Sequence, residues 1–290
     1  MSVPKTGPGD ASGGTAGAGW IPGVRGALFD VDGTLLVNDR AIPGAPEAIE
    51  RLRAAAIPFR LTTNTSRRPR SAIAEVLRRS GFRIEESEVL APCVLARRRI
   101  LESGRTRAAY LLPREAREDF EGVVEDEARP DWVVVGDVGR EFTWERLNRA
   151  YHWIHDGARL LALHKNRVWD NGQDGVVLDA GPFVEALEFA SGVAADLVGK
   201  PARPFFDLAL ADLGLPAASV MVVGDDLDAD CRGGAGAGCR TALVLTGRAR
   251  REDVEAAARA DVDKAAARAD VDRSAAPPDL VLGSVAELRP

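Results

Sequence analysis

The chain has 290 residues, of which 46% are hydrophobic, and this size and composition predict about two domains with a substantial buried core. The 38 basic residues are outnumbered by 44 acidic ones, and the net charge of −6 argues against nucleic acid or a membrane surface as the partner and favours a small molecule. No apolar run approaches the roughly 18 to 20 residues of a membrane span, and the N-terminal stretch lacks the apolar centre of a secretory signal, so we expect a cytoplasmic protein. Three cysteines without a Cys-x-x-Cys pair argue against a disulfide framework and against a zinc site.

Short apolar runs alternate with amphipathic stretches, a pattern that predicts an α/β fold of parallel strands joined by helices. We expect residues 1–20, rich in Gly, Ala, Ser, Thr and Pro, to form a disordered tail. A core domain is predicted from residues 21–102 and 193–290, with a second α/β unit, residues 103–192, inserted into it. The predicted core strands are 24–29, 59–62, 194–198, 220–223 and 241–245; those of the inserted unit are 108–112, 132–135 and 160–163, with helices near 144–155 and 182–190.

A short segment is duplicated near the C-terminus. Residues 256–264 read Ala-Ala-Ala-Arg-Ala-Asp-Val-Asp-Lys, and residues 265–273 repeat them almost unchanged. Two copies are too few for a solenoid, which needs about three or more. We expect a helical surface insertion without a catalytic role, and the sequence leaves open whether it is ordered.

Acidic residues directly follow two of the predicted core strands, at the edge of a parallel sheet where ligands bind. After the first strand the chain reads Asp30-Val-Asp-Gly-Thr, and extended backbone points the carboxylates of Asp30 and Asp32 the same way. After the strand at 220–223, a seven-residue stretch contains four carboxylates, those of Asp225, Asp226, Asp228 and Asp230. Such a concentration of negative charge is unfavourable unless a cation is bound, so the sequence predicts a site for a hard divalent ion.

The other two strand ends carry groups suited to an anion. Thr63-Asn64-Thr-Ser follows one strand, and Gly-Lys200-Pro follows another. Lysine stands out because only four of the 38 basic residues are lysine, which indicates a position that requires a compact ammonium. A carboxylate nucleophile surrounded by an oxygen-coordinated cation and by anion-binding groups indicates phosphoryl transfer, with Mg²⁺ as the cofactor and a small phosphorylated molecule as the substrate.

Taken in order, the motifs at Asp30 to Thr34, at Thr63 and Asn64, at Lys200, and at Asp225 with Asp230 resemble the four motifs of the haloacid dehalogenase-like superfamily. The resemblance implies a Rossmann-like parallel-sheet core with an inserted α/β cap domain. Because the large gap lies between Thr63 and Lys200, the cap resembles the type II, subclass A arrangement. Finer matches, such as Thr63-Asn-Thr-Ser-Arg and Val133-Val-Val-Gly, resemble the branch that contains phospholysine phosphohistidine inorganic pyrophosphate phosphatase and hydrolase-domain-containing relatives.

The resemblance also implies roles for individual residues. Asp30 would attack phosphorus as the nucleophile, and Asp32 would protonate the leaving group and then activate water. The implied Mg²⁺ ligands are the side chains of Asp30 and Asp225 and the backbone carbonyl of Asp32, with Asp230 as an orienting or alternative ligand and Asp226 as either a further ligand or a loop carboxylate. The implied phosphate-binding residues are Gly33, Thr63, Asn64 and Lys200.

The inserted unit is less informative about function. Arg67, Arg68 and His164 could contact the substrate, but a solvated helix face for the arginines and a structural hydrogen bond for the histidine are the favoured interpretations. Trp144 and Trp169 are predicted in the core of the inserted unit. The resemblance further suggests a homodimer formed through the cap.

Several activities remain open at this point. A haloacid dehalogenase is disfavoured because that chemistry has no use for Asp32 or the metal cluster. A phosphatase acting on a small phosphorylated metabolite, pyrophosphate or a phosphoramidate fits best. A phosphotransferase and a catalytically silent metabolite-binding protein are the alternatives, and the sequence does not give the physiological substrate, the catalytic efficiency or the oligomeric state.

Overall fold

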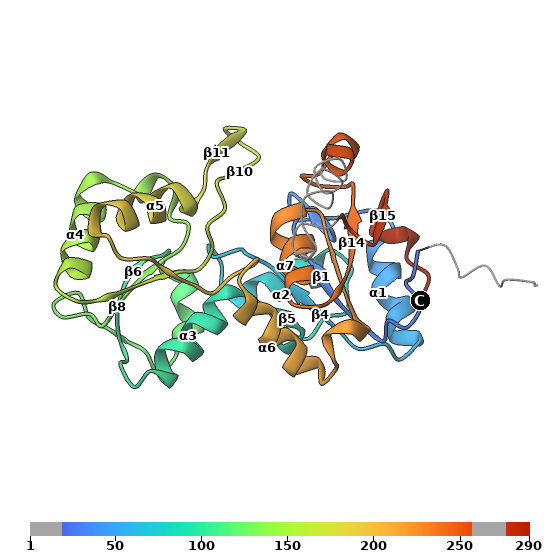
Figure 1. Cartoon of the computed structure of the whole chain (residues 1–290), viewed down its shortest axis with the longest axis horizontal. Helices are drawn as coiled ribbons and strands as arrows, with labels where there is room; N and C mark the ends of the chain where they lie inside the picture. The colour runs from blue at the N-terminus through green and yellow to red at the C-terminus, as the bar shows by residue number, and fades with distance from the viewer. Residues whose placement is uncertain (1–18, 257–276) are drawn as a thin grey trace, which may run out of the picture.

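The computed structural model describes residues 19–256 and 277–290, which form two lobes joined side by side (Figure 1). The predictions for residues 1–18 of the N-terminal tail and for nearly all of the duplicated segment therefore lie outside the described residues. Gly19 is buried and Trp20 packs against the core, so the prediction of a disordered tail was wrong for these two residues. Each lobe contains its own parallel sheet. In the part of the chain that is described, no helix is both long enough and apolar enough to cross a membrane.

The first lobe is built around a six-stranded parallel sheet with the order β15-β14-β13-β1-β4-β5. Every residue of its two central strands is buried, as expected for strands covered on both faces. The strands are β1 (Gly26–Asp30), β4 (Phe59–Thr62), β5 (Val89–Leu90), β13 (Val220–Gly224), β14 (Arg240–Val244) and β15 (Leu280–Leu282). A small hairpin, β2 (Leu36–Val37) and β3 (Arg40–Ala41), follows β1.

Alternate residues of β1 face two different hydrophobic clusters, which places helices on both sides of this sheet. Phe29 packs in the cluster that contains α1 (Ala45–Ala54) and α2 (Arg70–Arg79), whereas Leu28 packs in the cluster that contains α3 (Pro92–Glu102) and α6 (Arg203–Leu213). The chain returns to the sheet after β13 through a π-helical turn (Leu227–Arg232) and α7 (Gly233–Gly236). This three-layer arrangement confirms the predicted α/β fold with a Rossmann-like parallel core.

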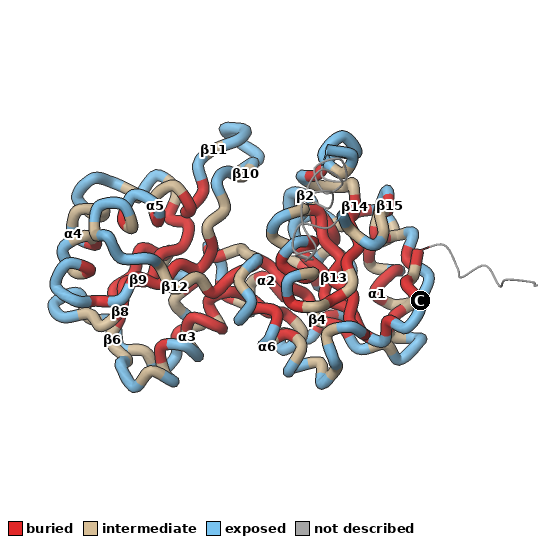
Figure 2. The backbone as a smooth tube through the Cα atoms, in the orientation of Figure 1, coloured by how far each residue is buried: buried red, intermediate tan, exposed pale blue. Residues whose placement is uncertain are grey.

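The second lobe has a five-stranded parallel sheet with the order β12-β9-β8-β6-β7. Its helices α4 and α5 pack against it around a separate hydrophobic cluster (Figure 2). The elements are β6 (Arg107–Leu111), β7 (Val124–Glu125), β8 (Trp132–Val135), α4 (Trp144–His155), β9 (Arg159–Ala162), α5 (Ala180–Ser191) and β12 (Asp196–Leu197).

The strand predicted at 194–198 was assigned to the wrong sheet. It forms β12, which pairs with β9 of the second lobe, through Asp196 with Leu161 and Leu197 with Ala162. A short apolar run specifies a strand but not its neighbour, because sheet membership depends on residues far away in the sequence. Lys200 therefore lies where the chain passes from the second lobe back to the first.

A two-stranded hairpin, β10 (Val168–Asp170) and β11 (Val176–Leu178), projects from the second lobe (Figure 1). Trp169 lies on this hairpin, and Trp144 is 72% exposed at the start of α4, so the prediction of a core position for both was wrong. Trp132 on β8 is the fully buried tryptophan of this lobe. The first residue of an amphipathic helix can lie on its exposed face, and composition alone does not show on which face Trp144 lies.

Candidate active site

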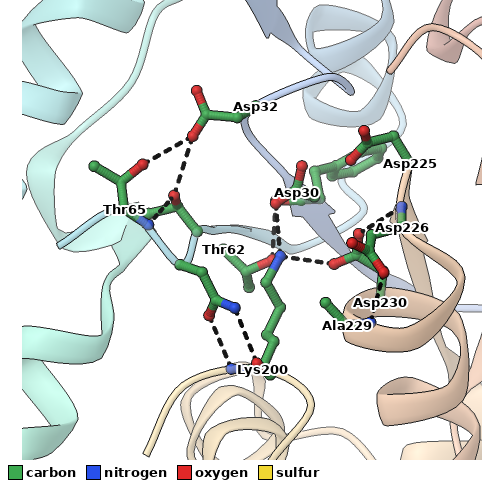
Figure 3. A network of polar contacts seen from close by, with 12 residues as sticks. Asp30, Asp32, Thr62, Thr65, Lys200, Asp225, Asp226, Ala229 and Asp230 are labelled. Carbon is green, nitrogen blue, oxygen red and sulfur yellow. Dashed lines mark hydrogen bonds and ion pairs between the residues drawn. The ribbon is translucent and has the colours of Figure 1, made fainter. Parts of the chain in front are cut away.

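The site lies at the carboxyl ends of the central core strands. Because β1, β4 and β13 are adjacent and parallel, Asp30, Thr63 and Asp225 reach the same edge of the sheet. Lys200 enters from the loop that follows β12, and its side chain extends between Asp30 and Asp230 (Figure 3). Residues up to 200 positions apart in the chain therefore converge on one site.

Three carboxylates and one ammonium form the centre of the site. Asp30, Asp225 and Asp230 each offer an oxygen within 4.8 Å of the others. Lys200 Nζ donates to Asp30 Oδ1 and to Asp230 Oδ1, at 2.6 Å in both cases. All four side chains are buried, with Lys200 only 2% exposed. When all four groups are ionised, their net charge of −2 equals the charge that a divalent cation neutralises.

Burial and mutual repulsion shape the ionisation of these groups. Burial, together with repulsion from the neighbouring carboxylate of Asp230, raises the pKa of Asp225 to about 6. Burial also raises the pKa of Asp30 and of Asp230, although Lys200 opposes the change in both. Burial favours a lower pKa for Lys200, but the carboxylates of Asp230 and Asp30 outweigh it and raise that pKa, so the lysine remains charged.

The carboxylate cluster has the properties of a binding site for a hard cation. Asp30 Oδ2 is buried and has no hydrogen-bond partner, which is an unfavourable state for a carboxylate oxygen unless another ligand approaches it. Proteins usually bind Mg²⁺ through the oxygens of one or two carboxylates, and water and substrate fill its remaining coordination positions. Asp30 and Asp225 would provide these ligands. Asp230 already accepts hydrogen bonds from Lys200 Nζ and from the Asp226 amide, so it orients the lysine as well as adding charge.

Glycines surround the carboxylates because a side chain would occupy the same space. A Cβ atom on Gly33 would lie 2.3 Å from Asp225 Oδ2, one on Gly247 would lie 1.9 Å from the same oxygen, and one on Gly224 would lie 2.1 Å from Asp230 Oδ2. The Gly33 amide, predicted at the phosphate, instead donates to the Leu36 carbonyl at 2.7 Å. The close approach that glycine allows at position 33 is therefore to the Asp225 carboxylate.

Asp32 stands apart from the carboxylate cluster. It is exposed, and in Figure 3 its side chain lies on the side of Thr65, away from Asp225. Thr65 Oγ1 donates to Asp32 Oδ2 at 2.9 Å, and Thr63 Oγ1 donates to the same oxygen at 3.4 Å. Asp32 is thus held by two threonine hydroxyls on the exposed side of the carboxylate cluster.

Asp226, considered as a further metal ligand, has a different role. Its Oδ1 accepts hydrogen bonds from the amides of Asp228 and Ala229, at 2.8 and 2.9 Å, and so caps the π-helical turn after β13. Its Oδ2 lies 3.4 Å from Arg248 Nη1. Because the side chain is committed to the cap, Asp226 is not a member of the carboxylate cluster.

The Asn64 side chain is committed to the backbone of Lys200 and not directed to a phosphate. Its Oδ1 accepts from the Lys200 amide and its Nδ2 donates to the Lys200 carbonyl, both at 2.9 Å. The same Nδ2 lies 3.2 Å from Oδ1 of Asn166, which belongs to the second lobe. The sequence could not reveal this role because the partners are more than 100 positions away.

The three candidate substrate contacts are engaged within the protein. Arg67 donates to Asp137 Oδ2 at 3.1 Å and lies over the Trp169 ring, with 5.3 Å between the guanidinium carbon and the ring centroid. Arg68 forms a two-pronged pair with Asp39, at 2.9 and 2.8 Å. His164 is buried, and its Nε2 lies 2.9 Å from Ser66 Oγ. The structural interpretation of His164 therefore fits its surroundings, and Arg67 joins the lobes.

The roles of three residues of the site were not predicted from the sequence. Thr65 holds Asp32, Thr246 Oγ1 donates to the Gly33 carbonyl at 2.6 Å, and Asn166 contacts Asn64. Thr65 could have been found, because it is two residues beyond Thr63 and alternate residues of an extended segment face the same way. The other two lie in elements whose placement next to the site is a property of the complete fold.

Comparisons with known proteins identify the family of the chain. The model of the haloacid dehalogenase-like hydrolase family matches residues 27–123, and a second model, described as HAD-hydrolase-like, matches residues 197–288. Haloacid dehalogenase-like hydrolase domain-containing protein 2 of Homo sapiens is 38% identical over 232 residues, which cover 80% of this chain and 88% of that protein. Phospholysine phosphohistidine inorganic pyrophosphate phosphatase of Homo sapiens is 35% identical over 239 residues, covering 80% and 87%.

Solved structures extend the comparison to the complete fold. A p-nitrophenyl phosphatase from Archaeoglobus fulgidus matches with a TM-score of 0.80 at 27% identity, covering 92% of this chain and 98% of that one. A 4-nitrophenylphosphatase from Thermotoga maritima matches with a TM-score of 0.79 at 30% identity, covering 91% and 96%. The resemblance expected from the four motifs is confirmed, and the chain belongs to the haloacid dehalogenase-like hydrolases.

Proposed function

We propose that this hydrolase is a Mg²⁺-dependent phosphatase that forms a phosphoryl-enzyme at Asp30. The observation that carries the proposal is the state of the Asp30 carboxylate. One of its oxygens is held by Lys200 at 2.6 Å, and the other is buried without a hydrogen-bond partner. A carboxylate with one oxygen open to a cation and the other beside a fixed ammonium is suited to nucleophilic attack on phosphorus, because both positive charges offset the charge of the approaching phosphate. The phosphatase names of the relatives support the same reaction.

In the first half of the reaction, an oxygen of Asp30 bonds to phosphorus while the bond from phosphorus to the leaving group breaks. Asp32 gives its proton to the departing group. In the second half, water attacks the phosphoryl group on Asp30, Asp32 takes a proton from that water, and inorganic phosphate leaves. Lys200 offsets the negative charge on Asp30 and on the phosphoryl oxygens throughout, because its ammonium is held against Asp30.

Asp30 and Asp225 would hold Mg²⁺, together with the predicted backbone carbonyl of Asp32. The bound ion would neutralise charge shared by the nucleophile and the substrate phosphate. Thr63 would contribute its hydroxyl near Asp32, while Gly33, Gly224 and Gly247 keep the space around the carboxylates free of side chains. The second lobe would act as the cap over a small substrate, such as a phosphorylated metabolite, pyrophosphate or a phosphoramidate.

The test is phosphate release from a panel of phosphomonoesters, pyrophosphate and phosphoramidates, measured with Mg²⁺ and with a chelator. Wild type is compared with Asp30→Asn and with the matched control Asp226→Asn. We expect Mg²⁺-dependent turnover that is lost in Asp30→Asn and kept in Asp226→Asn, because asparagine caps a helix as well as aspartate does. Rapid quenching followed by mass spectrometry of the Asp30 peptide should detect one added phosphoryl group. Equal turnover in wild type and Asp30→Asn would rule out this nucleophile.

A further inference from the structure

The segment that follows β4, residues 63–66, contacts the catalytic centre with its odd-numbered residues and the second lobe with its even-numbered ones. Thr63 and Thr65 both donate to Asp32 Oδ2. Asn64 and Ser66 contact Asn166 and His164 of the second lobe, at 3.2 and 2.9 Å. Alternation of this kind is what an extended segment produces when two different surfaces lie on its two sides. The segment is therefore placed to relate the position of one lobe to the geometry of the other.

Within this segment, Asn64 holds the backbone on both sides of the Lys200 Cα atom. The carboxamide uses its acceptor on the Lys200 amide and its donor on the Lys200 carbonyl, each at 2.9 Å. The fit leaves no space for a side chain on the preceding residue, since a Cβ atom on Gly199 would lie 2.8 Å from Asn64 Oδ1 and 2.2 Å from the Leu163 carbonyl oxygen. This close fit fixes the backbone from which the long, flexible Lys200 side chain extends.

The placement of Lys200 needs such a contact because the residue comes from the second lobe. The strand before it, β12, pairs with β9 in the second sheet, whereas the Lys200 ammonium lies 2.6 Å from Asp30 on β1 of the first sheet. A change in the angle between the lobes would shift the lysine relative to Asp30. Asn64, which follows β4, is the residue through which the first lobe holds the Lys200 backbone.

Asn166 extends the link into the body of the second lobe. Its Oδ1 accepts from Asn64 Nδ2, and its backbone carbonyl accepts from the Gly181 amide in the first turn of α5, at 2.9 Å. Asp179 is buried and caps the first turn of α5 through the Ala180 amide at 2.7 Å. A continuous set of hydrogen bonds therefore runs from the start of α5 through Asn166 and Asn64 to the residue that contacts the nucleophile.

We propose that Asn64 is a positioning residue that joins Lys200 to Asn166, so that charge stabilisation at Asp30 depends on the placement of the second lobe. The proposal rests on the proposed phosphatase function for its effect on rate, but the structural link itself is independent of any reaction. Asn64 acts through Lys200 and touches no reacting atom in this role.

The first test is a double-mutant cycle on kcat with Asn64→Ala, Asn166→Ala and the double variant, at saturating Mg²⁺ and well below the unfolding temperature. Misplacement of a catalytic group by about 1 Å costs about 10²-fold, so we expect about that loss in kcat for Asn64→Ala, with a smaller change in KM. We expect the kcat of Asn166→Ala to fall only about tenfold, since the contacts of Asn64 with Lys200 remain. Because both residues act through one link, the double variant should match Asn64→Ala, whereas independent roles predict a loss of about 10³-fold.

Asn148→Ala is the matched control, because Asn148 lies on α4 in the same lobe. Asn148→Ala should keep the wild-type kcat and should not change the effects of Asn64→Ala and Asn166→Ala. Multiplicative losses in the double variant, or an unchanged kcat in Asn64→Ala, would overturn the proposal. If Asn64→Ala does not fold, Asn166→Ala compared with Asn148→Ala still decides whether the second lobe affects the rate.

The second test needs no activity and uses hydrogen exchange, followed by mass spectrometry on the peptide that contains Lys200. The Lys200 amide donates to Asn64 Oδ1, so Asn64→Ala should accelerate its exchange without accelerating exchange in the strands of either sheet. Asn166→Ala should produce a smaller acceleration in the same peptide, and Asn148→Ala none. If wild type shows no turnover, the phosphatase function fails while this measurement still decides the link. Unchanged exchange at Lys200 in Asn64→Ala would refute the link itself.

Discussion

The Thr65 hydroxyl donates a hydrogen bond to Asp32 Oδ2 at 2.9 Å. Thr65 lies in the segment that follows β4, whereas Asp32 follows the neighbouring strand β1. Asp32 is exposed, so this contact, with the longer one from Thr63, is what orients its carboxylate. In the proposed reaction Asp32 must face the leaving group in one step and water in the next. A residue that only orients it should affect the proton transfer and not the binding of phosphate.

Thr65→Val should therefore lower kcat selectively for substrates with poor leaving groups. We expect a loss of about tenfold for alkyl phosphates and a much smaller one for p-nitrophenyl phosphate, whose leaving group needs little protonation. The measurement is kcat across a series of leaving groups with increasing pKa. Thr65→Ser keeps a hydroxyl and is the control, which should follow the wild-type series. An equal loss for every leaving group would show that Thr65 does not act through Asp32.

Gly247→Ala should damage the metal site more than the fold. The added Cβ atom would lie 1.9 Å from Asp225 Oδ2, so the carboxylate has to move away from its present position. We expect kcat to fall by about 10²-fold and the thermal stabilisation by Mg²⁺ to shrink. Gly283→Ala is the control, because its Cβ atom would meet only the flexible end of Glu287, at 2.7 Å. Normal Mg²⁺ stabilisation in Gly247→Ala would exclude Asp225 as a ligand.

Mg²⁺ binding should weaken as the pH falls through the pKa of Asp225. Burial, with repulsion from Asp230, raises that pKa to about 6 from an ordinary value of 3.8. Between these values the folded, metal-free protein binds more protons than the unfolded chain, so this group lowers stability as the pH rises through about 6. Mg²⁺ binds the ionised form and should offset this loss at high pH.

The measurement is the unfolding temperature with Mg²⁺ and with a chelator, at pH 7.5 and at pH 5. We expect a clear increase with Mg²⁺ at pH 7.5 and a much smaller one at pH 5. Asp225→Asn removes the titrating ligand and should show little increase at either pH. An identical Mg²⁺ effect in wild type at both pH values would contradict the assignment.

Much of the fold could be predicted from the sequence, because its strands and helices have strong local patterns. The predicted bounds of β4, β8 and α4 match the structure, since each has apolar residues at the spacing of its element. By contrast β5 and β15 were missed, as strands of two and three residues carry almost no periodic signal. The assignment of 194–198 to the core sheet failed for a different reason, because pairing is decided by long-range contacts.

The same division holds for the site. Asp30, Asp225 and Asp230 could be placed together because they lie at or after the carboxyl ends of β1 and β13, which are adjacent in one parallel sheet. Lys200 was placed with them from a strand that in fact belongs to the second sheet, so its position in the site was predicted from a wrong strand assignment. The partners of Asn64 and Gly33 could not be predicted, because a carboxamide or an amide at a strand end can serve a ligand or another segment equally well. Only the positions of Lys200 and Leu36 in the fold decide between these uses.

His164 should make the protein less stable in mild acid. Its imidazole is buried beside Ser66, and burial lowers its pKa from the ordinary value of 6.5, although Asp179 and Asp137 oppose the change. Below pH 6.5 the unfolded chain takes up a proton that the folded protein resists, so stability falls as the pH falls, by at most about 1.4 kcal/mol per pH unit from this group. The direction is opposite to that expected for Asp225, which allows the two contributions to be separated.

Urea unfolding of wild type and His164→Gln, with a chelator at pH 7.5, 6.5 and 5.5, measures this contribution. Glutamine can still bond to Ser66 but does not titrate, so the free energy of unfolding of His164→Gln should depend less on pH below 6.5 than that of wild type. His152→Gln replaces an exposed histidine on α4 and should retain the wild-type dependence. Since Asp225 is unchanged in all three proteins, its contribution cancels in the comparison. A pH dependence in His164→Gln equal to that of wild type would mean that the folded protein accepts a proton on His164, and the imidazole would then have to be charged at the junction of the two lobes.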